Sequence, residues 1–92
     1  MARKYRTQDH RYKGFVIGYS DYRCGWVVEP ALITSYPNAD ENKLSEISIL
    51  IRDLLGEFST LKEAKNFVDE NLRELTVIVK ETLVEKYPEL FK

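Results

Sequence analysis

The chain has 92 residues, of which 43% are apolar and 32% are charged, so it has the length and composition of one small folded domain. Its one cysteine excludes an intramolecular disulfide, and no stretch approaches the roughly 20 apolar residues that a membrane-spanning helix needs. The lack of a disulfide framework and of an apolar leader predicts a cytoplasmic protein.

The net charge of −1 is unevenly distributed along the chain. Residues 1–13 hold five basic residues and one acidic residue, a balance of +4, whereas residues 14–92 hold nine basic and fourteen acidic residues, a balance of −5. This pattern predicts a basic, flexible arm over residues 1–11 and a single folded domain over residues 12–92. Such an arm suits phosphate groups or an acidic protein surface, and the simpler alternative is a solvated, frayed terminus.

The first predicted strand covers residues 12–19. Phe15, Ile17 and Tyr19 alternate with smaller residues and therefore share one face, which is typical of a strand. Two glycines weaken this strand and indicate a bulge or the close approach of another backbone.

A hairpin returns the chain to a second strand. Residues 20–25 have the length and composition of a turn, and residues 26–29 form the strand that follows. Pro30 either ends this strand or places it at a sheet edge, with residues 31–34 as a candidate continuation after a bend.

Residues 35–43 are predicted to be a polar loop, and residues 44–55 after them fit two structures. At helical spacing the apolar residues of this segment share one face. By alternation Ile47, Ile49 and Ile51 share a face instead, and the β-branched composition favours a strand. We predict a third strand here, because a lone hairpin is marginally stable in water.

From Phe58 onward the sequence indicates the end of a strand or turn that runs into an amphipathic helix. Thr60 is placed to cap the first turn, and Glu63, three residues on, to bond back to it. The apolar stripe of this helix consists of Leu61, Ala64, Val68, Leu72, Leu75, Val79 and Leu83. The stripe fits one long helix or two helices with a break within residues 71–76. The predicted fold class is α+β, with a small antiparallel three-stranded sheet packed against one long or two consecutive C-terminal helices.

Residues 77–79 give this C-terminal helix a second apolar edge beside the stripe. The combined width is more than one sheet face requires. It predicts a partner helix or a homodimer through the C-terminal helix, and the alternative is a helix that packs only within its own core.

Three segments carry a family resemblance: Lys13-Gly14-Phe15-x-Ile17, the Trp26-x-Val28 strand and residues 58–69. Together they resemble the small strand–strand–strand–helix domains that are common among phage and mobile-element proteins, including the arm-binding domains of some integrases. The resemblance covers roughly residues 12–72. It implies a phage or prophage origin and a role in binding. In the integrase version, the sheet face contacts DNA with basic and aromatic side chains.

Catalytic and metal-binding patterns are missing from the sequence. The only histidine, His10, falls in the arm and the only thiol, Cys24, in the turn, so no nucleophile has an oriented base beside it. Zinc sites need clustered Cys and His, and the acidic segment at residues 40–42 lacks the ligand pattern of a calcium loop. The four glycines are too dispersed for a phosphate-binding loop. We expect no enzymatic activity, no metal and no cofactor.

Protein binding is the first functional hypothesis. Rigid aromatic side chains, which are enriched at interfaces, gather in the N-terminal half, and the body is acidic. The partner would be a host protein or a second copy of the chain. If the phage resemblance holds, one concrete form is an inhibitor or modulator of a host defence nuclease, since an acidic face competes with DNA for a basic cleft. The candidate partner-binding residues are Tyr19, Tyr22, Arg23, Tyr36, Val77 and Ile78.

The alternative hypothesis is a nucleic-acid-binding module that uses the arm and the aromatic hairpin. Basic residues interleaved with aromatic ones suit single strands, with the basic groups on phosphates and the rings on bases. The candidate residues are Arg3, Lys4, Arg6, Arg11 and Lys13. A body with a balance of −5 repels a phosphate backbone, so the first hypothesis is favoured.

Overall fold

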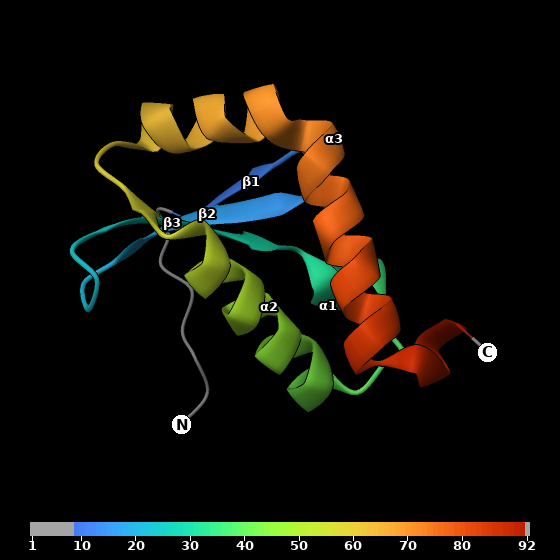
Figure 1. Ribbon diagram of the computed structural model, residues 1–92. Coiled ribbons are helices and arrows are strands. Elements are labelled where there is room, and N and C mark those ends of the chain that lie inside the picture. The colour runs from blue at the N-terminus through green and yellow to red at the C-terminus, as the bar shows by residue number, and fades with distance from the viewer. Residues whose placement is uncertain (1–8, 92) are drawn as a thin grey trace.

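The computed structural model describes residues 9–91, which form four strands, three α-helices and a final 3₁₀ helix (Figure 1). In chain order the elements are β1 (His10–Tyr12), β2 (Phe15–Ser20), β3 (Gly25–Pro30), α1 (Leu32–Ser35), α2 (Glu41–Leu55), β4 (Glu57–Phe58), α3 (Leu61–Lys86) and η1 (Pro88–Phe91). The α+β class is confirmed, but the described sheet has four strands where three were predicted.

The sheet is antiparallel, and its strands lie side by side in chain order. β1 and β2 are joined by Lys13 and Gly14, whose φ angles of 52° and 88° are those of the type I′ turn that matches a hairpin's twist. The predicted first strand is therefore divided by a turn. β1 also takes in His10 and Arg11 from the predicted arm, and residues 1–8 lie outside the described part of the chain.

The prediction of a strand over residues 44–55 is wrong, because this segment forms most of α2. The carboxylate of Asp40 caps the helix by accepting a hydrogen bond from the backbone N–H of Asn42 at 2.9 Å, and Gly56 ends the helix at a φ of 78°. A strand would place Ile47 and Ile49 on the same face, but Ile47 is buried and Ile49 is 42% exposed. Burial at helical spacing therefore outweighs the β-branched composition.

The predictions for the segments just before α2 also need correction. The predicted loop over residues 35–43 is four residues too long, because α1 includes Ser35 and α2 begins at Glu41. Residues 31–34 do not continue β3, because the chain turns directly into the short helix α1. At this edge the Ser48 hydroxyl of α2 donates to the backbone carbonyl of Pro30 at 3.4 Å, so a helix side chain replaces a strand neighbour there.

α3 begins as predicted. The Thr60 hydroxyl accepts a hydrogen bond from the backbone N–H of Glu63 at 3.0 Å. The Glu63 carboxylate bonds back to the N–H of Ser59 at 3.1 Å, one residue before the expected position. β4, which ends at Phe58, leads into this cap, so the predicted passage from a strand end to a helix is confirmed.

A kink at Asn71 divides α3 into two arms. Asn71 has non-helical angles (φ −121°, ψ 18°), and its side-chain amide donates to the carbonyl of Phe67 at 2.9 Å. Figure 1 shows that the first arm (residues 61–70) runs along the sheet and that the second arm (residues 72–86) turns away and converges with α2. Of the two predicted alternatives, one long helix or two helices with a break within residues 71–76, the structure shows the break.

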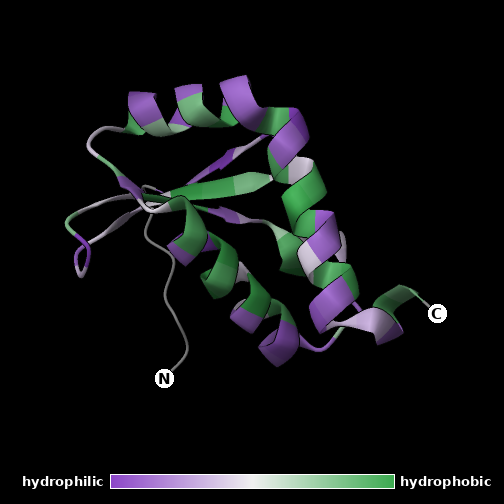
Figure 2. Ribbon diagram, viewed as in Figure 1, coloured by the Kyte–Doolittle hydropathy of each residue, from purple (hydrophilic) through white to green (hydrophobic). Residues whose placement is uncertain are grey.

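The two arms pack into two clusters. The first arm covers the sheet face that carries Phe15, Ile17 and Val28, and the second arm packs with α1 and α2 around buried Leu44 and Leu83. Leu55 and Val79 contact both clusters and make the core continuous. In Figure 2, α2 and α3 each carry hydrophobic and hydrophilic residues along their lengths, as expected for helices with one buried side.

Candidate functional site

The tip of the β2–β3 hairpin consists of Asp21–Cys24, between the paired residues Ser20 and Gly25. The Ser20 hydroxyl accepts a hydrogen bond from the backbone N–H of Arg23 at 3.2 Å, and Cys24 has a positive φ of 56°. Gly25 lies so close to β4 that a Cβ there would come within 3.1 Å of the carbonyl oxygen of Phe58. These local contacts close the tip and hold it against β4.

Arg23 joins the tip to two other elements. Its Nη2 donates to Oδ1 of Asp53 in α2 at 2.6 Å, and its Nη1 donates to Oε2 of Glu57 in β4 at 3.2 Å. One guanidinium with two carboxylate partners has a restricted orientation. The sequence marked Arg23 as a contact residue, and the structure places it as the brace of the tip.

Tyr22 projects from this braced tip and is 96% exposed. The strands below the tip carry three rings in contact, those of His10 on β1, Tyr19 on β2 and Trp26 on β3, here called the aromatic cluster. The rings of Tyr19 and Trp26 meet edge to face with centroids 5.6 Å apart, and His10 lies 6.1 Å from Trp26. Tyr19 is partly exposed, so both the Tyr22 ring at the tip and the Tyr19 ring on β2 are accessible to a partner.

The only histidine and the only cysteine of the chain, His10 and Cys24, lie in different parts of the structure. His10 pairs with Ile17 in the sheet, whereas Cys24 is exposed at the tip, where its thiol donates to the carbonyl of Asp21 at 3.5 Å. Three residues of β2 separate Ile17 from the tip, a rise of about 10 Å. Within residues 9–91, no group of three or more His, Cys, Asp and Glu residues is arranged to hold a metal ion.

The described members of the basic set are bound to the protein's own side chains. Nη1 of Arg11 donates to the Thr34 hydroxyl at 2.9 Å, and Nζ of Lys13 lies 2.5 Å from Oδ1 of Asp69. The Tyr12 hydroxyl donates to the same carboxylate at 2.8 Å. Arg3, Lys4 and Arg6 lie outside the described residues.

These contacts shift three pKa values. The hydrogen bond from Lys13, and then that from Tyr12, hold the pKa of Asp69 below its ordinary value. The Asp69 carboxylate in turn raises the pKa of Lys13 and of Tyr12, in each case mainly through the hydrogen bond. Asp69 thus fixes the β1–β2 turn to the first arm of α3.

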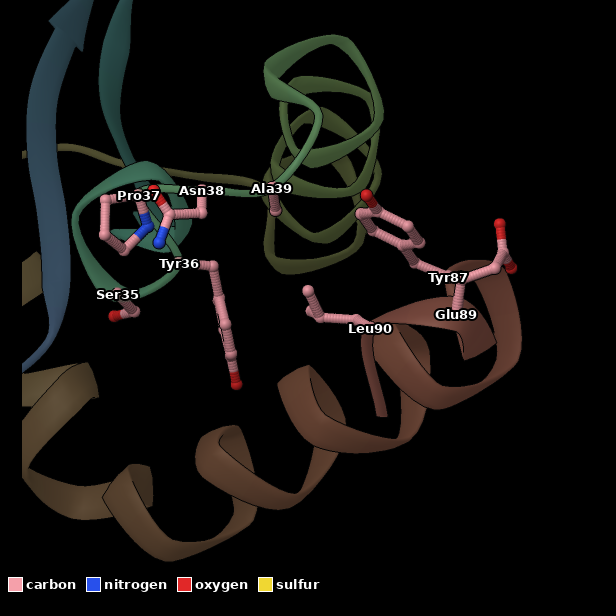
Figure 3. A pocket seen from close by; sticks show the side chains of 8 residues that line it. All are labelled: Ser35, Tyr36, Pro37, Asn38, Ala39, Tyr87, Glu89 and Leu90. Carbon is pink, nitrogen blue, oxygen red and sulfur yellow. The ribbon is translucent and has the colours of Figure 1, made fainter. Parts of the chain in front are cut away.

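Tyr36 lines an open pocket of about 350 Å³ between the α1–α2 loop and the C-terminal end (Figure 3). The Tyr87 hydroxyl on its far side accepts a hydrogen bond from the backbone N–H of Asp40 at 3.2 Å, and Leu90 lies between the two rings. Lys43 stacks over the Tyr87 ring and pairs with Glu89 at 2.9 Å. Figure 1 places this region at the opposite end of the molecule from the tip, so Tyr36 does not belong to the same surface as Tyr22.

The two candidates on α3 lie on different sides of the second arm. Val77 is exposed, whereas Ile78 is half-buried, and its carbonyl accepts a hydrogen bond from the Thr82 hydroxyl at 2.8 Å. Val84 is as exposed as Val77 and follows it by seven residues, but it was not among the predicted contact residues. The seven-residue spacing was the available signal.

Comparison with known proteins gave no match: no family model, no curated protein and no solved structure is significantly similar to this chain. Of the described helices, none is long and apolar enough to cross a membrane.

Proposed function

We propose that this protein is a non-enzymatic protein-binding module whose main contact is the braced hairpin tip. The observation that carries the proposal is the position of Tyr22, which is 96% exposed on a tip that Arg23 ties to Asp53 and Glu57. Tyrosine is among the residues that contribute most at interfaces, because it buries a large apolar ring and keeps a hydroxyl for hydrogen bonding.

The brace supports the proposal for an energetic reason. A flexible loop loses conformational entropy when it binds, and that loss weakens the complex. The bonds from Arg23 to α2 and β4 restrict the loop before any partner arrives. Tyr19 and Trp26 extend the apolar contact area beside the tip.

Charge favours a basic partner. Residues 14–92 carry a balance of −5. Complementary charge speeds association and selects against wrong partners. A partner with a basic cleft and a pocket for an aromatic ring fits these features, and inhibition or modulation of a host nuclease is one concrete form of the proposal.

Affinity capture with a matched pair of variants tests the proposal. Wild type, Tyr22→Ala and Phe91→Ala would be used as baits in bacterial lysate, and the captured proteins compared by quantitative mass spectrometry. Phe91 is the control, since it is a partly exposed ring at the C-terminal end of the described chain. The proposal predicts a stoichiometric partner that is retained by Phe91→Ala and lost with Tyr22→Ala.

Nucleic acid is the competing ligand class, and light scattering separates it from protein binding. The mass of the protein would be measured at low salt with and without mixed single-stranded and duplex oligonucleotides. Because Lys13 is paired with Asp69 and residues 14–92 carry a balance of −5, we expect no oligonucleotide complex. A complex that disappears as salt rises, together with capture that Tyr22→Ala leaves unchanged, would contradict the proposed function.

A further inference from the structure

The outward side of the second arm of α3 carries a charge and valine pattern that occurs twice. Arg73, Glu74 and Val77 are followed seven residues later by Lys80, Glu81 and Val84. All six side chains are exposed, whereas Leu75 and Leu83 on the inner side are buried. The arm spans residues 72–86, which corresponds to a length of about 22 Å.

None of the four charged residues in this pattern forms an ion pair within the described chain. The intramolecular packing therefore does not account for the order of basic residue, acidic residue and valine. Residues three, four and seven apart lie on one face of a helix, so Val77 and Val84 form a line along the middle of this face. The two basic residues lie on one side of that line, and the two acidic residues lie on the other side.

Two copies of this face complement each other when they are parallel. A two-fold axis along the arm brings Val77 beside Val77 of a second copy, and Val84 beside its own counterpart. The same axis brings each basic residue beside the neighbouring acidic residue of the other copy: Arg73 beside Glu74, and Lys80 beside Glu81. An antiparallel pair would bring like charges together on each flank, which is unfavourable.

We propose that this face is a homodimer interface in which the second arms of two α3 helices pack in parallel. The occupant is a second copy because a rotation of 180° sets the basic flank of this face against the acidic flank of the same face in the other copy, which is the property of an isologous contact. β-Branched residues at the central positions also suit a two-stranded parallel pair.

The interface is small. A single pair of arms buries on the order of 1,000 Å² in total, the lower end of the range for specific interfaces. The dimer is therefore weak and forms at high local concentration. Figure 1 shows the hairpin tip on the opposite side of the molecule from the second arm, so the dimer leaves two tips free for bivalent binding.

Charge exchange at Lys80 and Glu81 tests the proposal by sedimentation velocity. Wild-type full chain, examined up to about 1 mM at low ionic strength, is expected to form a dimer. Lys80→Glu and Glu81→Lys each turn both contacts repulsive and should raise the dissociation constant about tenfold. The double variant should restore the wild-type value, and an equimolar mixture of the two single variants should form a heterodimer.

Cysteine crosslinking tests the parallel direction. In a Cys24→Ser background, Val77→Cys should form an intermolecular disulfide, because the two-fold axis places residue 77 beside itself. Asn66→Cys on the first arm is the control and should stay reduced. A monomer at every concentration, or a dimer that Lys80→Glu leaves unchanged, would overturn the proposal. Circular dichroism of each variant distinguishes loss of dimer from loss of fold.

Discussion

Arg23 at the hairpin tip lies 2.6 Å from Asp53, a residue 30 positions further along the chain at the end of α2. The contact joins a tip that is exposed to solvent with a helix whose other side is buried in the core. It explains how a loop of four residues presents Tyr22 in a defined direction.

Replacing Arg23 with Met keeps an unbranched side chain but removes both ion pairs. We expect the free energy of unfolding to fall by less than about 1 kcal/mol, because Asp53 and Glu57 are partly solvated. Partner affinity should fall more, because the tip becomes mobile before binding. Amide exchange at residues 20–25 should accelerate in the variant. Unchanged exchange would show that Arg23 does not restrain the tip.

The contribution of Asp69 to the free energy of unfolding should depend on pH. Its pKa is lowered in the folded state by Lys13 and Tyr12, so its contribution to stability is present above the unfolded pKa of about 3.9. That contribution is lost as pH falls through the lower, folded pKa. Urea unfolding of wild type and Asp69→Asn should therefore differ most near neutral pH and converge in acid. Since the pKa of Lys13 is raised, the difference should also shrink in strong alkali. A constant difference across pH would contradict this assignment.

The helical state of residues 44–55 has a direct test in two isoleucines. Ile47→Ala should reduce the free energy of unfolding by about 2–4 kcal/mol, because it leaves a cavity beside Leu44 and Leu83. Ile49→Ala should cost less than about 1 kcal/mol, because Ile49 is on the outer side of α2. A strand would make the two costs similar. Denaturant titration monitored by Trp26 fluorescence measures both.

Replacing Asn71 tests whether its side chain stabilises the kink in α3. Asn71→Ala removes the hydrogen bond to the Phe67 carbonyl and favours a straight helix, which would pull the second arm away from α2. We expect a loss of about 1 kcal/mol of stability. Asn66→Ala on the exposed side of the first arm is the matched control and should be neutral. Equal effects of the two substitutions would exclude a specific role of Asn71.

Local signals explain which parts of the fold were predictable from the sequence. The cap at Thr60, the apolar stripe of α3 and the β2–β3 hairpin depend on residues close in sequence, and each is confirmed. β1 and β4 contain three and two residues, too few for any alternation to be recognised. They form because β2 and β3 offer free edges, which is a tertiary effect.

The features of the candidate site were also predictable from the sequence only where they depend on local signals. Tyr22 was identifiable because a turn residue between two strands is exposed, and the structure gives it almost full exposure. The partners of Arg23 were not identifiable, because Asp53 and Glu57 come from α2 and β4, and α2 was predicted to be a strand. The separation of Tyr36 from the tip depends on the path of α1, which the sequence also did not indicate.

Site-specific photo-crosslinking would show directly whether the partner contacts residue 22. A photoreactive phenylalanine analogue would replace Tyr22 in one protein and Phe91 in another, and each would be irradiated with the captured partner. We expect a covalent complex from position 22 and none from position 91. Crosslinking from position 91 alone, with position 22 silent, would show that the partner binds the far end of the molecule and would contradict the proposed function.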